Sequence, residues 1–101
     1  MFGGDSVKGT FVNSYGVVFN LITTQRLDDY ITYGRPEKKD SWFSDYAWEI
    51  VLCAQCQKHL GWRFSTNRDI VPKSFFGLTE SAVVFWYSVC YKYFRKETTR
   101  K

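Results

Sequence analysis

One stretch, Ser41 to Phe64, constrains the fold of this 101-residue chain more than any other. It holds three of the four tryptophans, two of the three cysteines and the single histidine. Within it, residues 46–52 and 60–64 alternate apolar side chains with a period of two, which is typical of a half-buried β-strand. Cys53-Ala54-Gln55-Cys56 lies between these segments. The sequence therefore predicts a β-hairpin whose turn is a Cys-x-x-Cys motif, a spacing that can place two thiolates on one metal ion.

The register of this hairpin brings aromatic side chains together. If the two strands fold symmetrically about the turn, Trp48 lies opposite Phe64, and Trp62 and Leu60 follow on the same face. Trp42, in the preceding loop, then has only to fold over this face to close a box of aromatic rings. Three tryptophans in one domain are more often core than cage, so the sequence leaves both interpretations open at this point.

The remaining chain has the composition of a β-protein. Aromatic residues make up 20% of it, and such residues favour strands. Further strands are predicted over residues 9–13, 17–24 and 30–33, followed by loop and strand over 75–85. We expect a single all-β domain over residues 9–84, a disordered N-terminus over 1–8, and an aromatic, then basic, C-terminal tail of unknown role over 85–101.

The C-terminal segment 83–94 has no assigned role. A strand packed on the sheet is the first interpretation of its aromatic and β-branched residues. The alternatives are an interfacial anchor, with aromatic rings in lipid headgroups, and a tail that is disordered or foreign to the domain. No stretch reaches the ~18 apolar residues that a membrane-spanning helix needs, and the first residues lack the pattern of a signal peptide.

The net charge of +4 is confined to one end of the chain. Residues 1–91 contain nine Lys or Arg and nine Asp or Glu, whereas residues 92–101 contain five basic residues and one acidic residue. Because the body is neutral, we expect no basic groove that follows phosphates and no nucleic-acid partner.

Several motifs resemble those of the CULT domain family, the thalidomide-binding domains of the cereblon type. They are Val12-Asn13-x-x-Gly16, Gly34-Arg35-Pro36, Ser41-Trp42-Phe43, Tyr46-Ala47-Trp48, Cys53-x-x-Cys56, His59-Leu60-Gly61-Trp62-Arg63-Phe64 and Ser74-Phe75-Phe76-Gly77-Leu78-Thr79-Glu80-Ser81-Ala82. The resemblance covers residues 9–83. It implies a β-tent, in which two antiparallel sheets meet at an angle, with a pocket on the second sheet.

The resemblance also implies a ligand and its site. The ligand would be a cyclic imide such as a glutarimide, as in thalidomide-type compounds or a cyclised protein C-terminus, or a uracil-like ring. The implied ligand-binding residues are the walls Trp42, Trp48 and Trp62, the floor Phe64, and the rim residues Asn13 and Asp40. The imide N–H would donate to the main-chain carbonyl of Asp40, and an imide carbonyl would accept from the main-chain N–H of Trp42. Tyr15 and Phe76 depart from the family pattern, which bears on selectivity.

The cysteines imply a structural zinc site, of which Cys53 and Cys56 supply two of the four ligands that such a site needs. In the family the other two come from a second Cys-x-x-Cys that precedes the segment equivalent to residues 11–16, and this sequence lacks it. Only half of the site is therefore expected here, through N-terminal truncation or loss of the metal. Cys90 alone could not replace the missing pair. A reduced pair of thiols in a turn is the alternative.

Two other functions compete with a non-enzymatic binding module. A methyl-ammonium reader would use the same aromatic cage with Asp40 and Asp45 as its acidic rim. An enzyme similar to type B methionine sulfoxide reductases would need Cys90 as its nucleophile, in apolar surroundings that raise a thiol pKa. His59 has no nucleophile at a suitable spacing, so we expect a structural role for it. Family members that recruit a ubiquitin ligase do so through a Lon-like domain, which this sequence does not encode, and both intracellular and secreted relatives leave the compartment open.

Overall fold

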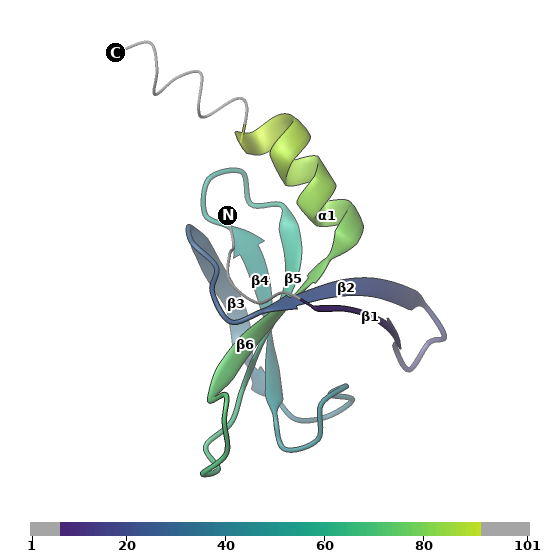
Figure 1. The fold of residues 1–101 in the computed structure, drawn as a ribbon, viewed down its shortest axis with the longest axis vertical. Coiled ribbons are helices and arrows are strands. Elements are labelled where there is room, and N and C mark those ends of the chain that lie inside the picture. The colour runs from purple at the N-terminus through teal and green to yellow at the C-terminus, as the bar shows by residue number, and fades with distance from the viewer. Residues whose placement is uncertain (1–6, 92–101) are drawn as a thin grey trace.

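The computed structural model describes residues 7–91, which form six strands and a C-terminal helical segment (Figure 1). In chain order the elements are β1 (Val7–Val12), β2 (Val18–Thr24), β3 (Tyr30–Glu37), β4 (Ala47–Cys53), β5 (His59–Ser65), β6 (Ser74–Thr79), α1 (Glu80–Phe85) and the π-helical η1 (Trp86–Tyr91). The predicted all-β class is confirmed. We expected disorder over residues 1–8, but Val7 and Lys8 belong to β1. Residues 1–6 and the basic end from residue 92 lie outside the described residues.

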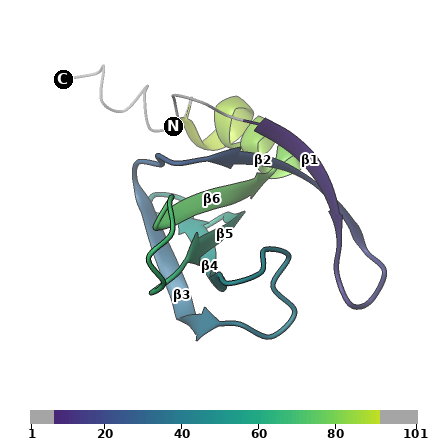
Figure 2. The same cartoon turned by 60° about the horizontal axis from the view of Figure 1, so that its bottom comes forward.

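All strands belong to one antiparallel sheet with the order β1-β2-β6-β5-β4-β3. The sheet is bent, because β1 and β2 run across the direction of β4 and β5 (Figure 1). The two sheets expected from the resemblance are therefore the two ends of one hydrogen-bonded sheet, which β6 joins by pairing with both β2 and β5. The β1–β2 turn and the β3–β4 loop lie on the same side of the molecule (Figure 2).

The β4–β5 hairpin has the predicted register at its aromatic end. Trp48 pairs with Phe64, and Ile50 pairs with Trp62. Next to the Cys-x-x-Cys turn the register shifts by a bulge, because His59 pairs with Leu52 but Gly61 with Val51. A bulge places one extra residue on a strand and changes which face the following side chain takes.

This bulge corrects one prediction about the hairpin. Leu60 does not share a face with Trp62 and Phe64, because it is the extra residue and is buried in the core cluster with Val51 and Leu78. The His59 ring instead contacts Trp62, with ring centroids 5.1 Å apart. The strict period of two thus holds for residues 62–64 but fails one step closer to the turn.

Gly61 lets β5 and β6 approach closely where the hairpin meets the core. A Cβ at this position would lie 2.0 Å from the carbonyl oxygen of Gly77 and 2.8 Å from the Cα of Leu78. Both are backbone atoms of β6, so no side-chain movement could relieve the contact. Glycine is therefore required beside Trp62 for the backbones to lie this close.

The main core lies on the face of β4 opposite to Trp48 and is covered by the C-terminal helix. Its buried members are Ile22, Leu27, Val51, Cys53, Leu60, Phe76, Leu78, Ala82, Val83, Trp86 and Cys90. The expectation of a strand from Val83 onward is wrong for the described residues, which are helical through Tyr91. The predicted boundary after Val84 falls inside α1, and Trp86 and Cys90 beyond it belong to the core.

The helix starts where β6 ends because Thr79 caps it. The Thr79 hydroxyl oxygen accepts a hydrogen bond from the backbone N–H of Ala82, at 3.3 Å, and Glu80 occupies the first turn. Both features stabilise a helix N-terminus. Within residues 7–91 neither helical segment has the length and apolar character that crossing a bilayer requires.

Candidate ligand-binding cavity and thiol cluster

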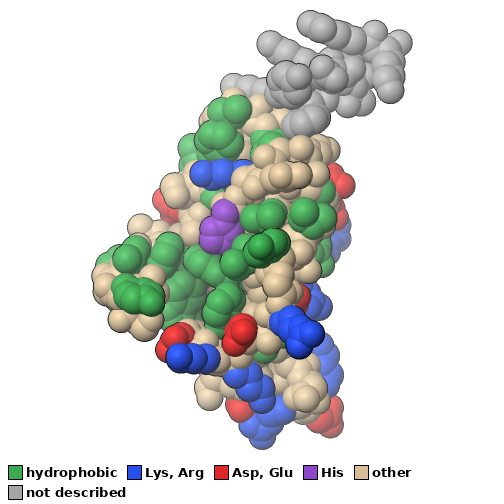
Figure 3. Space-filling model, turned by 180° about the vertical axis from the view of Figure 1, so that it is seen from behind, with side chains coloured by type: hydrophobic (Ala, Val, Ile, Leu, Met, Phe, Trp, Pro, Cys, Tyr) green, Lys and Arg blue, Asp and Glu red, His purple; other side chains and the backbone are tan. Residues whose placement is uncertain are grey.

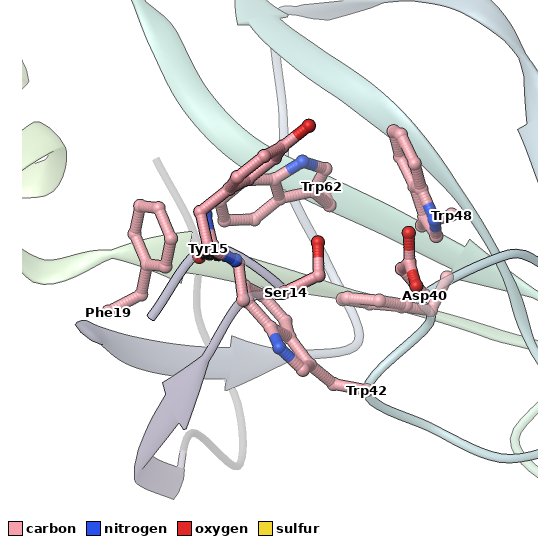
Figure 4. A pocket seen from close by; sticks show the side chains of 9 residues that line it. Ser14, Tyr15, Phe19, Asp40, Trp42, Trp48 and Trp62 are labelled. Carbon is pink, nitrogen blue, oxygen red and sulfur yellow. Dashed lines mark hydrogen bonds between the residues drawn. The ribbon is translucent and has the colours of Figure 1, made fainter. Parts of the chain in front are cut away.

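A cavity of about 240 Å³ lies where the β1–β2 turn and the β3–β4 loop meet the face of β4 and β5 that carries Trp48 and Trp62 (Figure 4). Its lining residues are Asn13, Ser14, Tyr15, Phe19, Asp40, Trp42, Trp48, Trp62 and Phe64. They come from segments up to 51 positions apart in the sequence, between Asn13 and Phe64. The bend of the sheet brings these segments together.

Two indole rings form a corner of the cavity. The rings of Trp42 and Trp62 are nearly perpendicular, with an interplanar angle of 85° and centroids 5.1 Å apart. Phe19 contacts both, at 5.6 Å from Trp42 and 5.3 Å from Trp62. Trp48 stands across the open space from this corner (Figure 4). Edge-to-face pairs of this kind fix ring orientations because the positive edge of one ring meets the negative face of the other.

The indole N–H groups of Trp42 and Trp48 are hydrogen-bonded to the backbone. The Trp42 Nε1–H donates to the carbonyl oxygen of Val12 at 2.8 Å, which ties the β3–β4 loop to the end of β1. The Trp48 Nε1–H donates to the carbonyl oxygen of Lys39 at 2.7 Å, within the same loop. Because these polar groups already have backbone partners, the two rings present apolar faces to the cavity.

The floor is a stack of buried phenylalanines. Phe64 is 1% exposed, its ring contacts Phe43 at 4.8 Å, and it stacks on Phe75 with an interplanar angle of 22°. Gly77 lies against the edge of this ring, because a Cβ at Gly77 would be only 3.0 Å from the Cε2 atom of Phe64. Phe64 is thus fixed from several sides, which makes the floor rigid.

The rim combines polar groups with one exposed ring. The Asn13 side-chain oxygen accepts from the backbone N–H groups of Tyr15 and Val17, both at 2.9 Å, so it shapes the β1–β2 turn as well as lining the cavity. Asp40 has a left-handed backbone, with φ of 60°, and its carboxylate lies at the rim beside Trp48 (Figure 4). Tyr15 is 90% exposed at the mouth.

All six residues that the resemblance implies for ligand binding border this one cavity; the list is Asn13, Asp40, Trp42, Trp48, Trp62 and Phe64. Their function as ligand contacts stays a prediction. Three lining residues were not in that set, namely Ser14, Tyr15 and Phe19. Phe19 lies on the strand predicted over residues 17–24, and no motif in the sequence marks it as a cavity residue. Phe76 is buried against Tyr30, with ring centroids 4.9 Å apart, and does not line the cavity.

The remaining candidate residues have structural partners. Asp45 forms an ion pair with Arg68 and does not line the cavity. His59 Nε2 lies 3.0 Å from the carbonyl oxygen of Gly61, and its ring packs edge-on against Trp62. The single histidine, purple in Figure 3, lies among hydrophobic side chains, and the charged side chains of this view gather mostly toward its lower part. The geometry therefore gives His59 a supporting position beside the cage.

A cluster of three thiols lies on the opposite face of β4. The sulfur atoms of Cys53, Cys56 and Cys90 lie within 4.8 Å of one another, and Cys53 Sγ is 3.7 Å from Cys90 Sγ. Sequence reasoning placed only the first two together, whereas η1 brings the third into the cluster. Three cysteines this close could hold a metal ion, and a thiolate set suits zinc.

The environment of the thiols differs from one to the next. Burial raises the pKa of the Cys53 thiol, but hydrogen bonds from the backbone N–H groups of Cys56 and Gln55 and from the Trp86 indole outweigh it, so the pKa is lowered overall. Burial raises the pKa of the Cys90 thiol far above its ordinary value, and the adjacent sulfurs raise it further. The cluster thus favours a thiolate at Cys53.

Fold and site together define a class: an all-β module that carries an aromatic-lined cavity on one face of its central hairpin and a thiol cluster on the other. Comparison with known sequences narrows this class. No protein family model matches the chain. It is, however, 40% identical over 75 residues to protein cereblon of Danio rerio, 39% over 75 residues to that of Gallus gallus, and 39% over 80 residues to that of Drosophila melanogaster.

These matches cover 73% to 76% of the chain but only 14% to 17% of the relatives. The chain therefore spans about a sixth of the length of the curated proteins that it resembles. The comparisons are consistent with a cereblon-like CULT domain in this chain, the family that its motifs resemble.

Proposed function

We propose that this chain is a non-enzymatic binding module that holds a cyclic imide, or a uracil-like ring, in the cage of Trp42, Trp48 and Trp62. The imide would be a glutarimide, as in thalidomide-type compounds, or the cyclised C-terminal residue of a protein. The observation that carries the proposal is the convergence of three indoles, whose orientations are fixed, on one small cavity.

The size and character of the cavity support a small, flat, largely apolar ligand. A volume of about 240 Å³ is below the ~300–1,000 Å³ of sites for drug-sized molecules. A single saturated ring would therefore fill the cage, and any larger group attached to it would project past Tyr15 and Asn13 at the mouth. Indole faces contribute dispersion and apolar burial to such a ring.

The backbone of the β3–β4 loop supplies groups for the polar edge of an imide. The turn is closed by the Ser41 N–H, which donates to the carbonyl oxygen of Lys38 at 3.2 Å. Among the described residues, no internal hydrogen bond uses the Asp40 carbonyl or the Trp42 main-chain N–H. We propose that this carbonyl and this N–H serve as the acceptor and the donor that an imide N–H and an imide carbonyl need.

The competing functions have weaker support. A methyl-ammonium reader has Asp40 at the rim, but the charge of Asp45 is neutralised by Arg68. An enzyme of the sulfoxide reductase type would need a thiol at the cavity, whereas Cys90 is buried on the opposite face of the sheet. Ubiquitin ligase recruitment is not part of the proposal, which concerns the cavity and the thiol cluster.

We further propose that Cys53 and Cys56 hold a structural zinc ion at the hairpin turn. Zinc bound there would fix the turn from which β5, and with it Trp62, extends. Structural zinc contributes directly to folding free energy, so its removal would destabilise the cage as well as the turn.

Fluorescence titration with three ligands distinguishes the candidate functions. The protein is titrated with glutarimide, with trimethyllysine and with methionine sulfoxide, and tryptophan emission is followed. We expect a saturable change with glutarimide alone, because only this ligand matches both the apolar walls and the backbone donor and acceptor.

Two variants test whether the cage is responsible. Trp62→Ala should abolish the response, whereas Tyr33→Ala, which removes an exposed ring on β3 outside the cavity, should leave it unchanged. A response to trimethyllysine only would support the reader function instead. A glutarimide response that survives Trp62→Ala would place the ligand elsewhere.

A further inference from the structure

We propose that Cys90 is a third thiolate ligand of the metal ion held by Cys53 and Cys56, so that the C-terminal helical segment closes the metal site. This inference rests on the proposed metal site but is independent of what occupies the aromatic cage. It assigns a function to a segment that follows residues 9–83, the part of the chain covered by the family motifs.

The sulfur positions fit tetrahedral coordination. Zinc–sulfur bonds of ~2.3 Å at tetrahedral angles place neighbouring sulfurs about 3.8 Å apart. Cys53 Sγ and Cys90 Sγ are 3.7 Å apart, and all three sulfurs lie within 4.8 Å of one another. One ion could therefore reach all three after small side-chain adjustments. A disulfide needs sulfurs about 2 Å apart, so this spacing favours a shared ion over a covalent link.

Two contacts, made by residues that precede Cys90, hold the helical segment over the turn. The Trp86 Nε1–H donates to Cys53 Sγ at 3.1 Å, which is the kind of outer hydrogen bond that orients a metal-bound thiolate. Lys58, in the turn itself, lies over the Phe85 ring at 4.8 Å from its centroid. The position of Cys90 is therefore set by its neighbours before a metal binds.

The burial of the cluster indicates where the fourth ligand would come from. Cys53 is 1% exposed and Cys90 is 2% exposed, whereas Cys56 is only partly buried. The side of the cluster at Cys56 is thus open to solvent. A water molecule would complete the coordination there.

Cobalt substitution of the reduced 101-residue chain tests the assignment. Co²⁺ bound to thiolates gives charge-transfer absorption that grows with the number of sulfur ligands. We expect Cys90→Ser to lower this absorption per bound cobalt by about a third, as for three thiolates reduced to two, and to weaken binding at least tenfold. The matched control is Val89→Ser, a serine substitution at the adjacent, exposed position of η1, which should change neither quantity.

X-ray absorption of the zinc-loaded wild-type protein gives a second measurement that does not depend on how a variant folds. We expect three sulfurs at about 2.3 Å and one lighter ligand. A fit with two sulfurs, or cobalt binding that Cys90→Ser leaves unchanged, would overturn the inference while leaving zinc at the turn intact. Failure of the wild-type chain to bind metal would overturn both metal proposals, and glutarimide binding would remain a separate question.

Discussion

The substitution Gly61→Ala tests how the close approach of β5 and β6 supports the cage. Its Cβ would lie 2.0 Å from the Gly77 carbonyl oxygen, whereas non-bonded heavy atoms settle at about 3.5 Å. Relief requires the strands to separate by roughly 1.5 Å, which weakens ladder hydrogen bonds worth about 0.5–1.5 kcal/mol each. Adding the ~1–3 kcal/mol of overpacking, we expect a loss of about 3–5 kcal/mol in the free energy of unfolding.

Urea unfolding followed by circular dichroism measures this loss. The matched control is Gly34→Ala, where φ is +87° but nothing lies within 4 Å of the new Cβ. That control has backbone strain without a clash, so we expect only about 1–2 kcal/mol. If the two variants were equally stable, the close contact with β6 would not be what requires glycine at position 61.

Three further outcomes follow from the structure. Thr79→Ala removes the helix cap and should lower stability by about 1 kcal/mol in thermal unfolding, whereas Thr79→Ser should restore most of it; equal stability of both variants would argue against the cap. Phe64→Ala empties the cavity floor and should cost about 3–5 kcal/mol, measured by urea unfolding, and a cost below 1 kcal/mol would contradict its tight packing. A strong zinc chelator should lower the melting temperature of the zinc-loaded wild-type protein by more than that of Cys53→Ser, and an equal effect on both would contradict a structural metal at the turn.

The central hairpin could be predicted from sequence because its signals are local. A period of two and a short turn determine which residues face each other, so Trp48 was correctly placed opposite Phe64. The prediction failed at Leu60, where the bulge beside the thiol turn adds a residue to β5. A bulge of this kind depends on how the turn closes, which strand periodicity does not report.

The C-terminal helix could not be predicted from the sequence for a different reason. Val83, Val84 and Phe85 have strand propensities, yet they form a helix because Thr79 caps the start and the core of the sheet buries Val83. The cap signal, Thr79 followed by Glu80, is present in the sequence, but the aromatic and β-branched residues that follow it indicate a strand. Tertiary burial decided the outcome, as it commonly does for such segments.

Of the two candidate sites, the cavity could largely be predicted from the sequence, whereas the complete thiol cluster could not. The three tryptophans that line the cavity could be anticipated because the family motifs contain them, whereas Phe19 lies on a predicted strand outside those motifs. Cys90 could not be assigned, because only the path of the chain through β6 and α1 brings it to Cys53 from 37 positions away. A single cysteine at that distance carries no spacing signal.

The central claim, that a cyclic imide binds inside the indole cage, is tested most directly by nuclear magnetic resonance of the four indole N–H groups. Trp42, Trp48 and Trp62 border the cavity, whereas Trp86 lies in the core on the other side of the sheet and serves as an internal control. On addition of glutarimide to the ¹⁵N-labelled protein, we predict saturable shifts of the three cage signals and no comparable shift of Trp86. Unchanged cage signals at saturating glutarimide, or equal shifts of all four, would contradict the account.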